Sequence, residues 1–243
     1  MPNPTAAILL IGDEILSGRT RDANMHFLAG ELTRCGIDLK EVRIVSDDHG
    51  AIVAAVNTLR AAYSHVFTSG GIGPTHDDIT ADAVAAAFGL PLAVRADARA
   101  ILAAHYERAG LDFNAARQRM ARIPEGAALI ENPISAAPGF SLGNVHVMAG
   151  VPDVFRAMAA SLLPRLTGGR PVLSQTLRVM QGEGVIAEPL AALAAEFSDL
   201  SFGSYPFVAS GAYGTNLVVR GTDPVRIDSA MTRLAALFPG DPA

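Results

Sequence analysis

Cysteine and lysine are almost absent from this chain of 243 residues, and each scarcity excludes a class of site. Cys35 is the only cysteine, so the chain forms no internal disulfide framework and no zinc site built from several thiolates. A single thiol also fits a reducing compartment. Lys40 is the only lysine, which excludes a P-loop lysine and leaves little scope for Schiff-base chemistry.

The charge and hydropathy patterns disfavour two kinds of partner. The chain has 19 basic and 24 acidic residues and lacks the long basic stripe that binds nucleic acid. Its N-terminus has no basic segment ahead of a long apolar run, and prolines and glycines interrupt the uncharged stretch 132–152. We therefore expect a cytoplasmic protein that binds neither nucleic acid nor membrane.

The order of apolar runs predicts an α/β fold. In the first part of the chain, short apolar runs alternate with helical patterns in the order 6–11, 22–35, 39–45, 47–62, 65–69 and 79–88. Strands joined in this way through helices form a largely parallel sheet with helices on both faces.

The second part of the chain has a different texture. Helices are predicted at 96–109, 114–122 and 151–163, a further short strand at 127–130, and a hairpin at 139–148. The glycine- and proline-rich composition of residues 167–171 is typical of a linker. We therefore predict an α/β domain at 1–168 and a small α+β module at 171–243.

Acidic pairs follow each of the first three predicted strands: Asp13–Glu14, Asp47–Asp48 and Asp77–Asp78. Because the carboxyl ends of parallel strands meet at one edge of the sheet, we expect these side chains to converge there. Carboxylates grouped in this way suit Mg²⁺ carrying a phosphate-bearing substrate. Each pair taken alone is also explained by helix capping, with Asp22, Asp47 and Asp78 as the capping residues.

A glycine-rich loop follows the third predicted strand. It reads Ser69-Gly70-Gly71-Ile72-Gly73-Pro74-Thr75-His76-Asp77-Asp78-Ile79-Thr80. Glycines let backbone N–H groups approach phosphate oxygens, and the next helix presents its positive end to an anion. The loop matches neither the dinucleotide fingerprint nor the P-loop, so it predicts a different phosphate-binding device.

Two segments together resemble the molybdopterin-binding-domain superfamily: 12–18, with Asp22 and Asn24 behind it, and 68–80. Within it, the chain resembles most closely the N-terminal part of competence/damage-inducible protein A and the molybdopterin-binding-like region of eukaryotic FAD synthases. Further strings match at 123–127, 132–133, 137–140, 150–152 and, in the small module, 203–206.

The resemblance implies a three-layer α/β/α sandwich with a mostly parallel sheet, and a homo-oligomer (dimer or trimer). The branch with the Gly-Gly-Ile-Gly-Pro-Thr-His-Asp-Asp string implies hydrolysis of ADP-ribose or FAD with Mg²⁺ or Co²⁺, with K⁺ as a further candidate ion. Molybdenum-cofactor adenylyltransferases carry an arginine where this chain has Asp77, a departure that disfavours adenylyl transfer. Molybdopterin adenylyl transfer and a non-catalytic pterin or nucleotide binder are the alternatives.

On this hypothesis Asp47 and Asp78 are catalytic, and Asp47, Asp77 and Asp78 bind the metal or orient the attacking water. The glycines of the loop hold the diphosphate, and Ser69, His76 and Thr80 donate hydrogen bonds to it. The full set of predicted ligand-binding residues is Asp13, Glu14, Asn24, Ser69, Gly70, Gly71, Gly73, His76, Thr80, Pro138, Gly139, Gly150 and Pro152.

A cluster of arginines remains outside this hypothesis. Arg108, Arg117, Arg119 and Arg122 lie on two predicted helices. A solvated helix face explains such a cluster, and a site for phosphate or carboxylate is the alternative.

Overall fold

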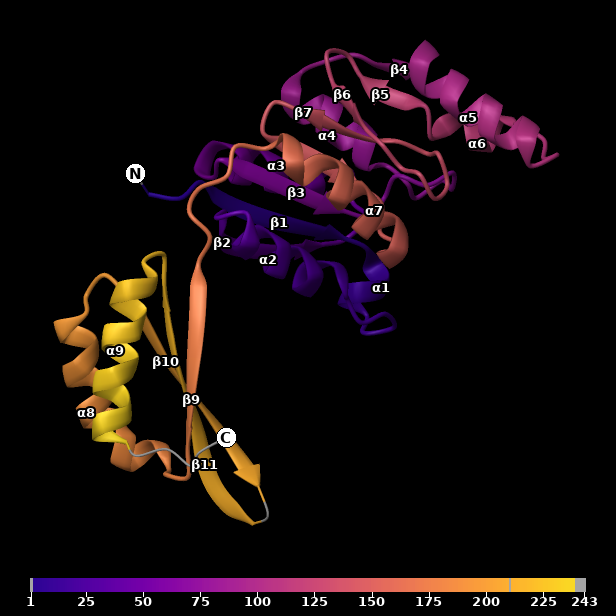
Figure 1. Cartoon of the computed structure of the whole chain (residues 1–243). Coiled ribbons are helices and arrows are strands. Elements are labelled where there is room, and N and C mark those ends of the chain that lie inside the picture. Colours follow the sequence, from indigo (N-terminus) through magenta and orange to yellow (C-terminus); the bar gives the residue numbers. More distant parts are fainter. Residues whose placement is uncertain (1, 210, 239–243) are drawn as a thin grey trace. The chain divides into compact units, whose positions relative to one another are not determined.

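The chain folds into two units, Met1–Gly169 and Arg170–Ala243, in a computed structural model that describes residues 2–209 and 211–238 (Figure 1). Each unit has its own hydrophobic core. Within the described ranges, no helix combines the length and the apolar character that crossing a membrane requires.

The first unit is built on a six-stranded sheet. The strand order is β2 (Asp38–Val45), β1 (Thr5–Ile11), β3 (His65–Ser69), β8 (Val145–Met148), β7 (Gly139–Leu142) and β6 (Ala128–Ile130). The first four strands are parallel, and β7 pairs antiparallel with both β8 and β6. The predicted mostly parallel sheet and the 139–148 hairpin are confirmed.

Alternate residues of β1 belong to two separate cores. Ala7, Leu9 and Ile11 face one hydrophobic cluster, whereas Ala6, Ile8 and Leu10 face the other. This division follows from the two-residue period of a strand, and full burial on both faces produces the continuous apolar run in the sequence. The strand is therefore the middle layer of the predicted sandwich.

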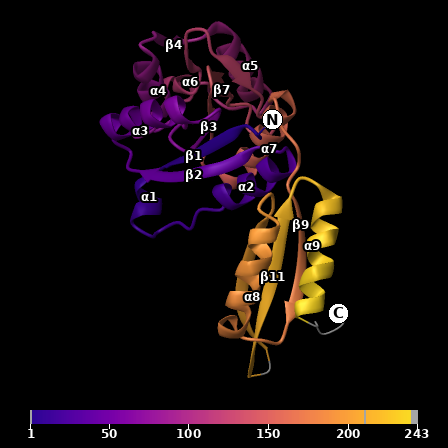
Figure 2. The same ribbon diagram turned by 90° about the vertical axis from the view of Figure 1, so that its left-hand side faces the viewer.

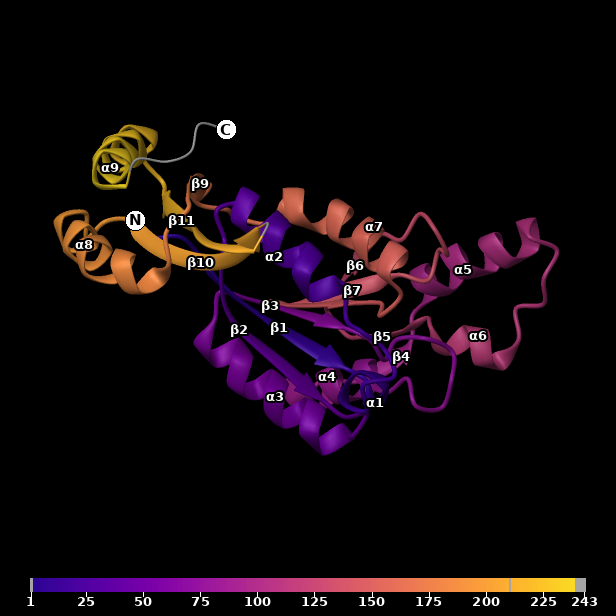
Figure 3. The ribbon, with the colours of Figure 1, turned by 90° about the horizontal axis from the view of Figure 1, so that it is seen from below.

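Helices cover both faces of this sheet, as predicted. They are α3 (His49–Ala62) and α4 (Thr80–Phe88) on one face, and α2 (Asn24–Arg34) and α7 (Pro152–Leu162), which continues into the short η1 (Leu163–Arg165), on the other. Figure 3 shows the two pairs on opposite sides of β1 and β3.

A smaller lobe extends from the α4 side of the sheet. It consists of β4 (Leu92–Val94) paired antiparallel with β5 (Arg122–Pro124), together with α5 (Ala96–Arg108) and α6 (Ala115–Arg119). The helix predicted at 114–122 is therefore too long, because Arg122 pairs with Val94 as a strand residue. A strand of three residues is too short for its pattern to be recognised.

Helix capping differs from the sequence-based expectation at two of three positions. Asp22 accepts hydrogen bonds from the N–H groups of Asn24 and Met25, as expected of a cap. The cap of α3 is Asp48, which accepts from Ala51 N–H at 2.8 Å, and not Asp47. The carboxylate of Asp78 makes no cap hydrogen bond with α4. Capping thus explains neither Asp47 nor Asp78.

The second unit is a three-stranded antiparallel sheet with two helices. The strands, in the order β10 (Ser201–Ala209), β11 (Ala212–Gly221) and β9 (Leu173–Val179), share one core with α8 (Glu183–Glu196) and α9 (Pro224–Leu237). Both helices lie on the same side of this sheet in Figure 1, and Figure 2 shows the same unit from another direction. The predicted small α+β module is confirmed.

A buried histidine, His146 on β8, pairs with the half-buried His65 on β3 in the first unit. His65 Nδ1 lies 3.2 Å from His146 Nε2, and Ser141 Oγ lies 2.9 Å from His146 Nδ1. Burial, together with the nearby charge of His65, lowers the pKa of His146 to about 3. The folded state therefore holds His146 neutral.

This buried histidine makes stability dependent on pH. Because the pKa of His146 is lower in the folded state, its contribution to stability is full above the unfolded pKa of about 6.5 and is lost as the pH falls toward 3. Between pH 6.5 and 5 we expect a loss of about 2 kcal/mol in the free energy of unfolding. Urea unfolding should show this loss in full in the wild type and in His76→Gln, whose ring is exposed, and only in smaller part in His146→Gln, where the lowered pKa of His65 still contributes. Equal pH dependence in all three proteins would contradict the assignment.

Candidate functional site

The carboxyl ends of β1, β2, β3 and β8 meet at one edge of the sheet. In register, Ile11 lies beside Val45, and Ser69 lies beside both Leu10 and Met148. The chain segments that leave these four strands therefore meet at this edge, as the sequence predicts for the first three of them.

Asp47 connects the ends of β1 and β2. The chain leaves β1 into the four-residue helix α1 (Asp13–Leu16), which the sequence reading missed. Asp47 Oδ2 accepts a hydrogen bond from the Asp13 N–H at 2.9 Å, and Gly12 N–H donates to the Val45 carbonyl at 3.1 Å. The side chain of Asp47 is thus held at a fixed place on the edge.

The glycine loop after β3 is folded back on itself by Thr80. Thr80 Oγ1 donates to the Gly70 carbonyl at 3.0 Å, and Thr80 N–H donates to the Gly71 carbonyl at the same distance. Gly70 and Gly71 have φ angles of 110° and 69°. A Cβ on Gly70 would stand 2.3 Å from the Ile11 carbonyl oxygen, so only glycine fits this position.

Asp78 holds the far part of the same loop. Its Oδ2 accepts hydrogen bonds from both the N–H and the hydroxyl of Thr75. A Cβ on Gly73 would lie 2.6 Å from that oxygen, so the loop backbone passes close to the carboxylate. Asp78 therefore shapes the loop in addition to facing the cavity described below.

Asn24 supports the loop from beneath. It is 4% exposed, and its Nδ2 donates to Ser69 Oγ at 2.8 Å and to the Gly150 carbonyl at 2.7 Å. These bonds tie the end of β3 to the segment that follows β8. Close packing results, because a Cβ on Gly150 would be 3.3 Å from the Gly70 Cα.

A cavity of about 500 Å³ lies at this edge, a size in the usual range for a small-molecule ligand. Its lining combines carboxylates, the glycine loop and apolar side chains. The residues are Ile11, Glu14, Thr20, Asp47, Gly70, Gly71, Ile72, Gly73, Asp77, Asp78, Met120, Asn132, Ser135, Ala137, Ala149, Gly150, Val151, Pro152 and Val154.

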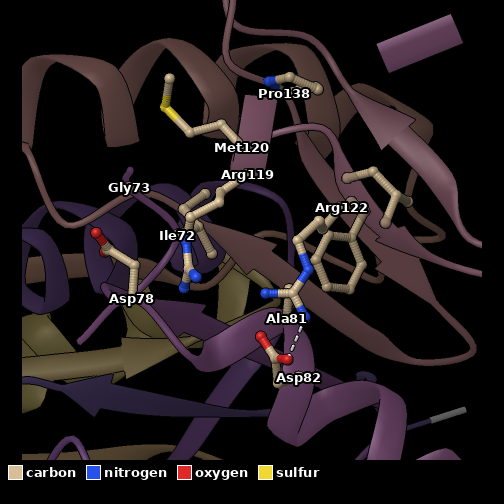
Figure 4. Close-up of a pocket in the computed structure, with 12 residues that line it drawn as sticks. Ile72, Gly73, Asp78, Ala81, Asp82, Arg119, Met120, Arg122 and Pro138 are labelled. Carbon is tan, nitrogen blue, oxygen red and sulfur yellow. Dashed lines mark hydrogen bonds and ion pairs between the residues drawn. The ribbon is translucent and has the colours of Figure 1, made fainter. Parts of the chain in front are cut away.

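Not every predicted residue reaches this cavity. Nine of the predicted residues are in its lining, and Pro138 lines a neighbouring recess shown in Figure 4. Six are in neither lining: Asp13, Asn24, Ser69, His76, Thr80 and Gly139. These six residues lie in different surroundings and are absent from the two linings for different reasons.

Three of these six, Ser69, Thr80 and Asn24, are buried beneath the loop, and the hydroxyl of Thr80 is engaged with the Gly70 carbonyl. They support the loop and do not present donors to the cavity, contrary to the expectation. Gly139 is a close-packing position, where a Cβ would meet the Val147 carbonyl at 2.4 Å. The His76 side chain is fully exposed to solvent.

Negative charge dominates the electrostatics of the cavity. Burial raises the pKa of Asp47, and the nearby carboxylates of Asp13, Glu14 and Asp77 raise it further, while the Asp13 N–H opposes the change. The pKa direction shows that Asp47 is held in an environment that disfavours its charge. Among the described residues that line this cavity there is no lysine, arginine or histidine.

The carboxylates do not form a closed metal site. In the described ranges, no three His, Cys, Asp or Glu side chains lie close enough to hold an ion by themselves. Mg²⁺, however, is usually held by one or two carboxylates together with substrate phosphates and water. The residues present therefore fit a divalent ion that is bound jointly with a phosphate ligand, and they do not fit a structural ion.

Sequence reasoning missed part of the cavity lining. Asn132 is buried and organises the loop before β7: its Oδ1 accepts from the N–H groups of Ile134 and Ser135, and its Nδ2 donates to the Ala137 carbonyl. The resemblance of the 132–133 string was the only signal for it. Met120 follows α6, where no motif marks it, whereas Arg119 at the end of α6 lines the neighbouring recess and belongs to the arginine cluster noted in the sequence.

The comparisons with known proteins decide the family. Residues 7–168 match the family model described as "Probable molybdopterin binding domain". The chain belongs to this family. Residues 171–242 match a second model, described as "FAD synthase, middle domain". The two matches correspond to the two units of the structure.

Similar proteins bear related names. A "Probable FAD synthase" of Caenorhabditis elegans is 31% identical over 97% of this chain and 50% of its own length. A "CinA-like protein" of Citrifermentans bemidjiense is 37% identical over 67% of this chain and 40% of its own length. The chain thus spans about half or less of these two relatives. The structure of a CinA protein of unknown function from Thermoplasma acidophilum superimposes with a TM-score of 0.62 and 32% identity, covering 67% of this chain and 97% of its own.

Proposed function

We propose that this protein hydrolyses an ADP-containing diphosphate, ADP-ribose or FAD, and releases AMP in the presence of a divalent ion. The observation that supports this proposal most is the presence of Asp47, Asp77, Asp78 and the glycine loop in the lining of one cavity. The names of the relatives also favour a nucleotide cofactor, because FAD contains an ADP moiety.

In this proposal the protein's own groups bind the diphosphate and move a proton. The loop of Gly70, Gly71 and Gly73 brings backbone close to the phosphate oxygens without side chains in the way. Asp47 uses Oδ2 to accept from Asp13, which leaves Oδ1 to orient water and accept its proton. The raised pKa of Asp47 makes it a better proton acceptor than an exposed aspartate.

A divalent ion is required by charge. The cavity is lined by Glu14, Asp47, Asp77 and Asp78, which repel a diphosphate unless a cation intervenes. When bound, Mg²⁺ or Co²⁺ neutralises phosphate charge and favours deprotonation of water. One or two of Asp47, Asp77 and Asp78 would hold it, with phosphate oxygens completing its ligands. K⁺ as a further ion and a homo-oligomeric state stay predictions.

Pterin binding, with or without adenylyl transfer, is a second candidate. The family description names molybdopterin, and the lining of the cavity includes the apolar residues Ile11, Ile72, Val151 and Val154, which suit a flat ring. This candidate predicts ligand binding without AMP release from ADP-ribose or FAD. For adenylyl transfer, ATP and molybdopterin together would give an adenylylated product.

The two candidates are separated by product analysis. Purified protein is incubated with ADP-ribose, with FAD, and with ATP plus molybdopterin, each with Mg²⁺, with Co²⁺ and with EDTA, and AMP is followed by chromatography. We expect AMP from ADP-ribose or FAD only with metal, and none from the Asp78→Ala variant. Release at equal rate in EDTA, or in that variant, would contradict the proposal. An adenylylated pterin without AMP release would favour the second candidate.

A further inference from the structure

Two arginines of the cluster in the smaller lobe, Arg108 and Arg117, make contacts within the lobe itself. Arg108 donates from its Nε to the Ala104 carbonyl at 3.1 Å, one turn earlier on α5. The Arg117 guanidinium lies over the Tyr106 ring, 4.5 Å from its centre. Neither Arg108 nor Arg117 is among the described residues that line the cavity or the recess.

Arg119 differs from its neighbours. Arg122 forms an ion pair with Asp82, drawn as the dashed line in Figure 4. In the part of the chain that the structure describes, Arg119 makes no ion pair, and its buried Nε has no hydrogen-bond partner. A buried donor of a charged group without a partner is unfavourable, so this position favours an acceptor that arrives with a ligand.

Arg119 lines a small recess that opens on the same loop as the main cavity. Figure 4 shows its guanidinium on the side of the recess where Asp78 and Ile72 lie. The recess and the cavity share Gly71, Ile72, Gly73, Asp78 and Met120. The recess is about 20 Å³, room for about one water molecule, so only the edge of a ligand in the cavity would enter it.

The charges around the loop indicate a role for Arg119. The described residues that line the main cavity include four carboxylates and no cationic side chain, and in the recess Arg122 is already neutralised by Asp82. Arg119 is thus the unpaired cation among the described residues that line either space. A diphosphate held at Gly71 and Gly73 would carry its charge next to this guanidinium, whose planar fork matches phosphate oxygens.

We propose that Arg119 is a substrate-binding residue that donates hydrogen bonds to the phosphate oxygens of an ADP-containing diphosphate at the glycine loop. The inference rests on the proposed function for the class of ligand, but it does not require hydrolysis. It assigns the recognition of the phosphates to a cation in the recess beside the loop. The carboxylates that line the cavity are then left for the ion and the water.

The test measures binding of a ligand that cannot be hydrolysed. Calorimetric titration with adenosine 5′-(α,β-methylene)diphosphate in Mg²⁺ buffer is compared with titration with adenosine, which has no phosphate. Arg119→Ala is expected to weaken binding of the diphosphate about 10- to 100-fold and to change binding of adenosine less than about twofold. Arg119→Lys keeps the charge and loses the planar fork, so its affinity for the diphosphate should lie between those of the wild type and Arg119→Ala. Arg108→Ala is the matched control and should bind both ligands like the wild type.

The outcomes separate this proposal from the proposed hydrolysis. The role of Arg119 would be overturned if Arg119→Ala bound the diphosphate within about twofold of wild type, or if it lost affinity for both ligands equally. It would also be overturned if the wild type did not bind the diphosphate. Melting temperatures of all variants show whether a loss comes from unfolding. If the wild type binds the diphosphate through Arg119 but releases no AMP from ADP-ribose, only the hydrolysis proposal fails.

Discussion

Replacing Asp47 with asparagine is expected to lower AMP release by about 10²- to 10⁴-fold while leaving the protein as stable as the wild type or more so. The activity falls because the amide neither accepts a proton from water nor attracts a divalent ion. The fold persists because asparagine Oδ1 can still accept the Asp13 N–H that Oδ2 accepts now.

The stability gain follows from the sign of the pKa change. Folding raises the pKa of Asp47, so the folded state binds this proton more tightly than the unfolded state does. Its contribution to stability is therefore favourable below the ordinary pKa of 3.8 and is lost as the pH rises through the raised pKa. At neutral pH the charge of Asp47 destabilises the fold, and removing it relieves the repulsion from Asp13, Glu14 and Asp77.

Asp48→Asn is the matched control for this experiment. Asp48 is the next residue and caps α3 through Ala51, a role that asparagine also fills. Rates of AMP release and melting temperatures are measured for both variants. An Asp47→Asn protein with wild-type activity, or equal losses in both variants, would remove Asp47 from the catalytic role.

Replacing Gly70 with alanine is expected to lower the free energy of unfolding by about 3 kcal/mol or more. Gly70 has a φ of 110°, which side chains other than hydrogen rarely permit. The added Cβ would also stand 2.3 Å from the Ile11 carbonyl oxygen, a backbone atom of the central strand. Strand β1 cannot move away from the added Cβ, because its residue Ile11 pairs with Val45 and belongs to the core.

Gly89→Ala separates the two causes. Gly89 also has a positive φ, 64°, but a Cβ there meets no atom within 4 Å. It should lower stability by about 1 kcal/mol, the effect of backbone conformation alone. Denaturant unfolding of both variants gives the comparison. Equal losses would show that the close approach of Gly70 to Ile11 is unimportant.

Much of the fold could be predicted because its signals are local. A strand buried on both faces produces an apolar run such as 6–11, and Gly89 ends α4 in the left-handed conformation that a helix C-cap favours. Short elements escaped prediction for the opposite reason. Helix α1 has four residues and β4 three, so neither shows a period, and both depend on contacts with distant parts of the chain.

The candidate site was predictable where its residues follow strands in the sequence. Asp47 and the glycine loop are placed by the ends of β2 and β3, and parallel strands align such ends without further information. Arg119 and Asn132 reach the same edge from the lobe and from the loop before β7, through tertiary packing that no local pattern specifies. The inward direction of Thr80 likewise depends on the loop closing over it.

The central claim, that water attacks a diphosphate in this cavity, is tested most directly by isotope incorporation. ADP-ribose and Mg²⁺ are incubated with the protein in H₂¹⁸O, and the products are measured by mass spectrometry. The account predicts AMP and ribose 5-phosphate in equal amounts, with one ¹⁸O atom in the phosphate of one of them, and neither product from Asp47→Asn. Absence of AMP from the wild type, or products without ¹⁸O, would contradict the account.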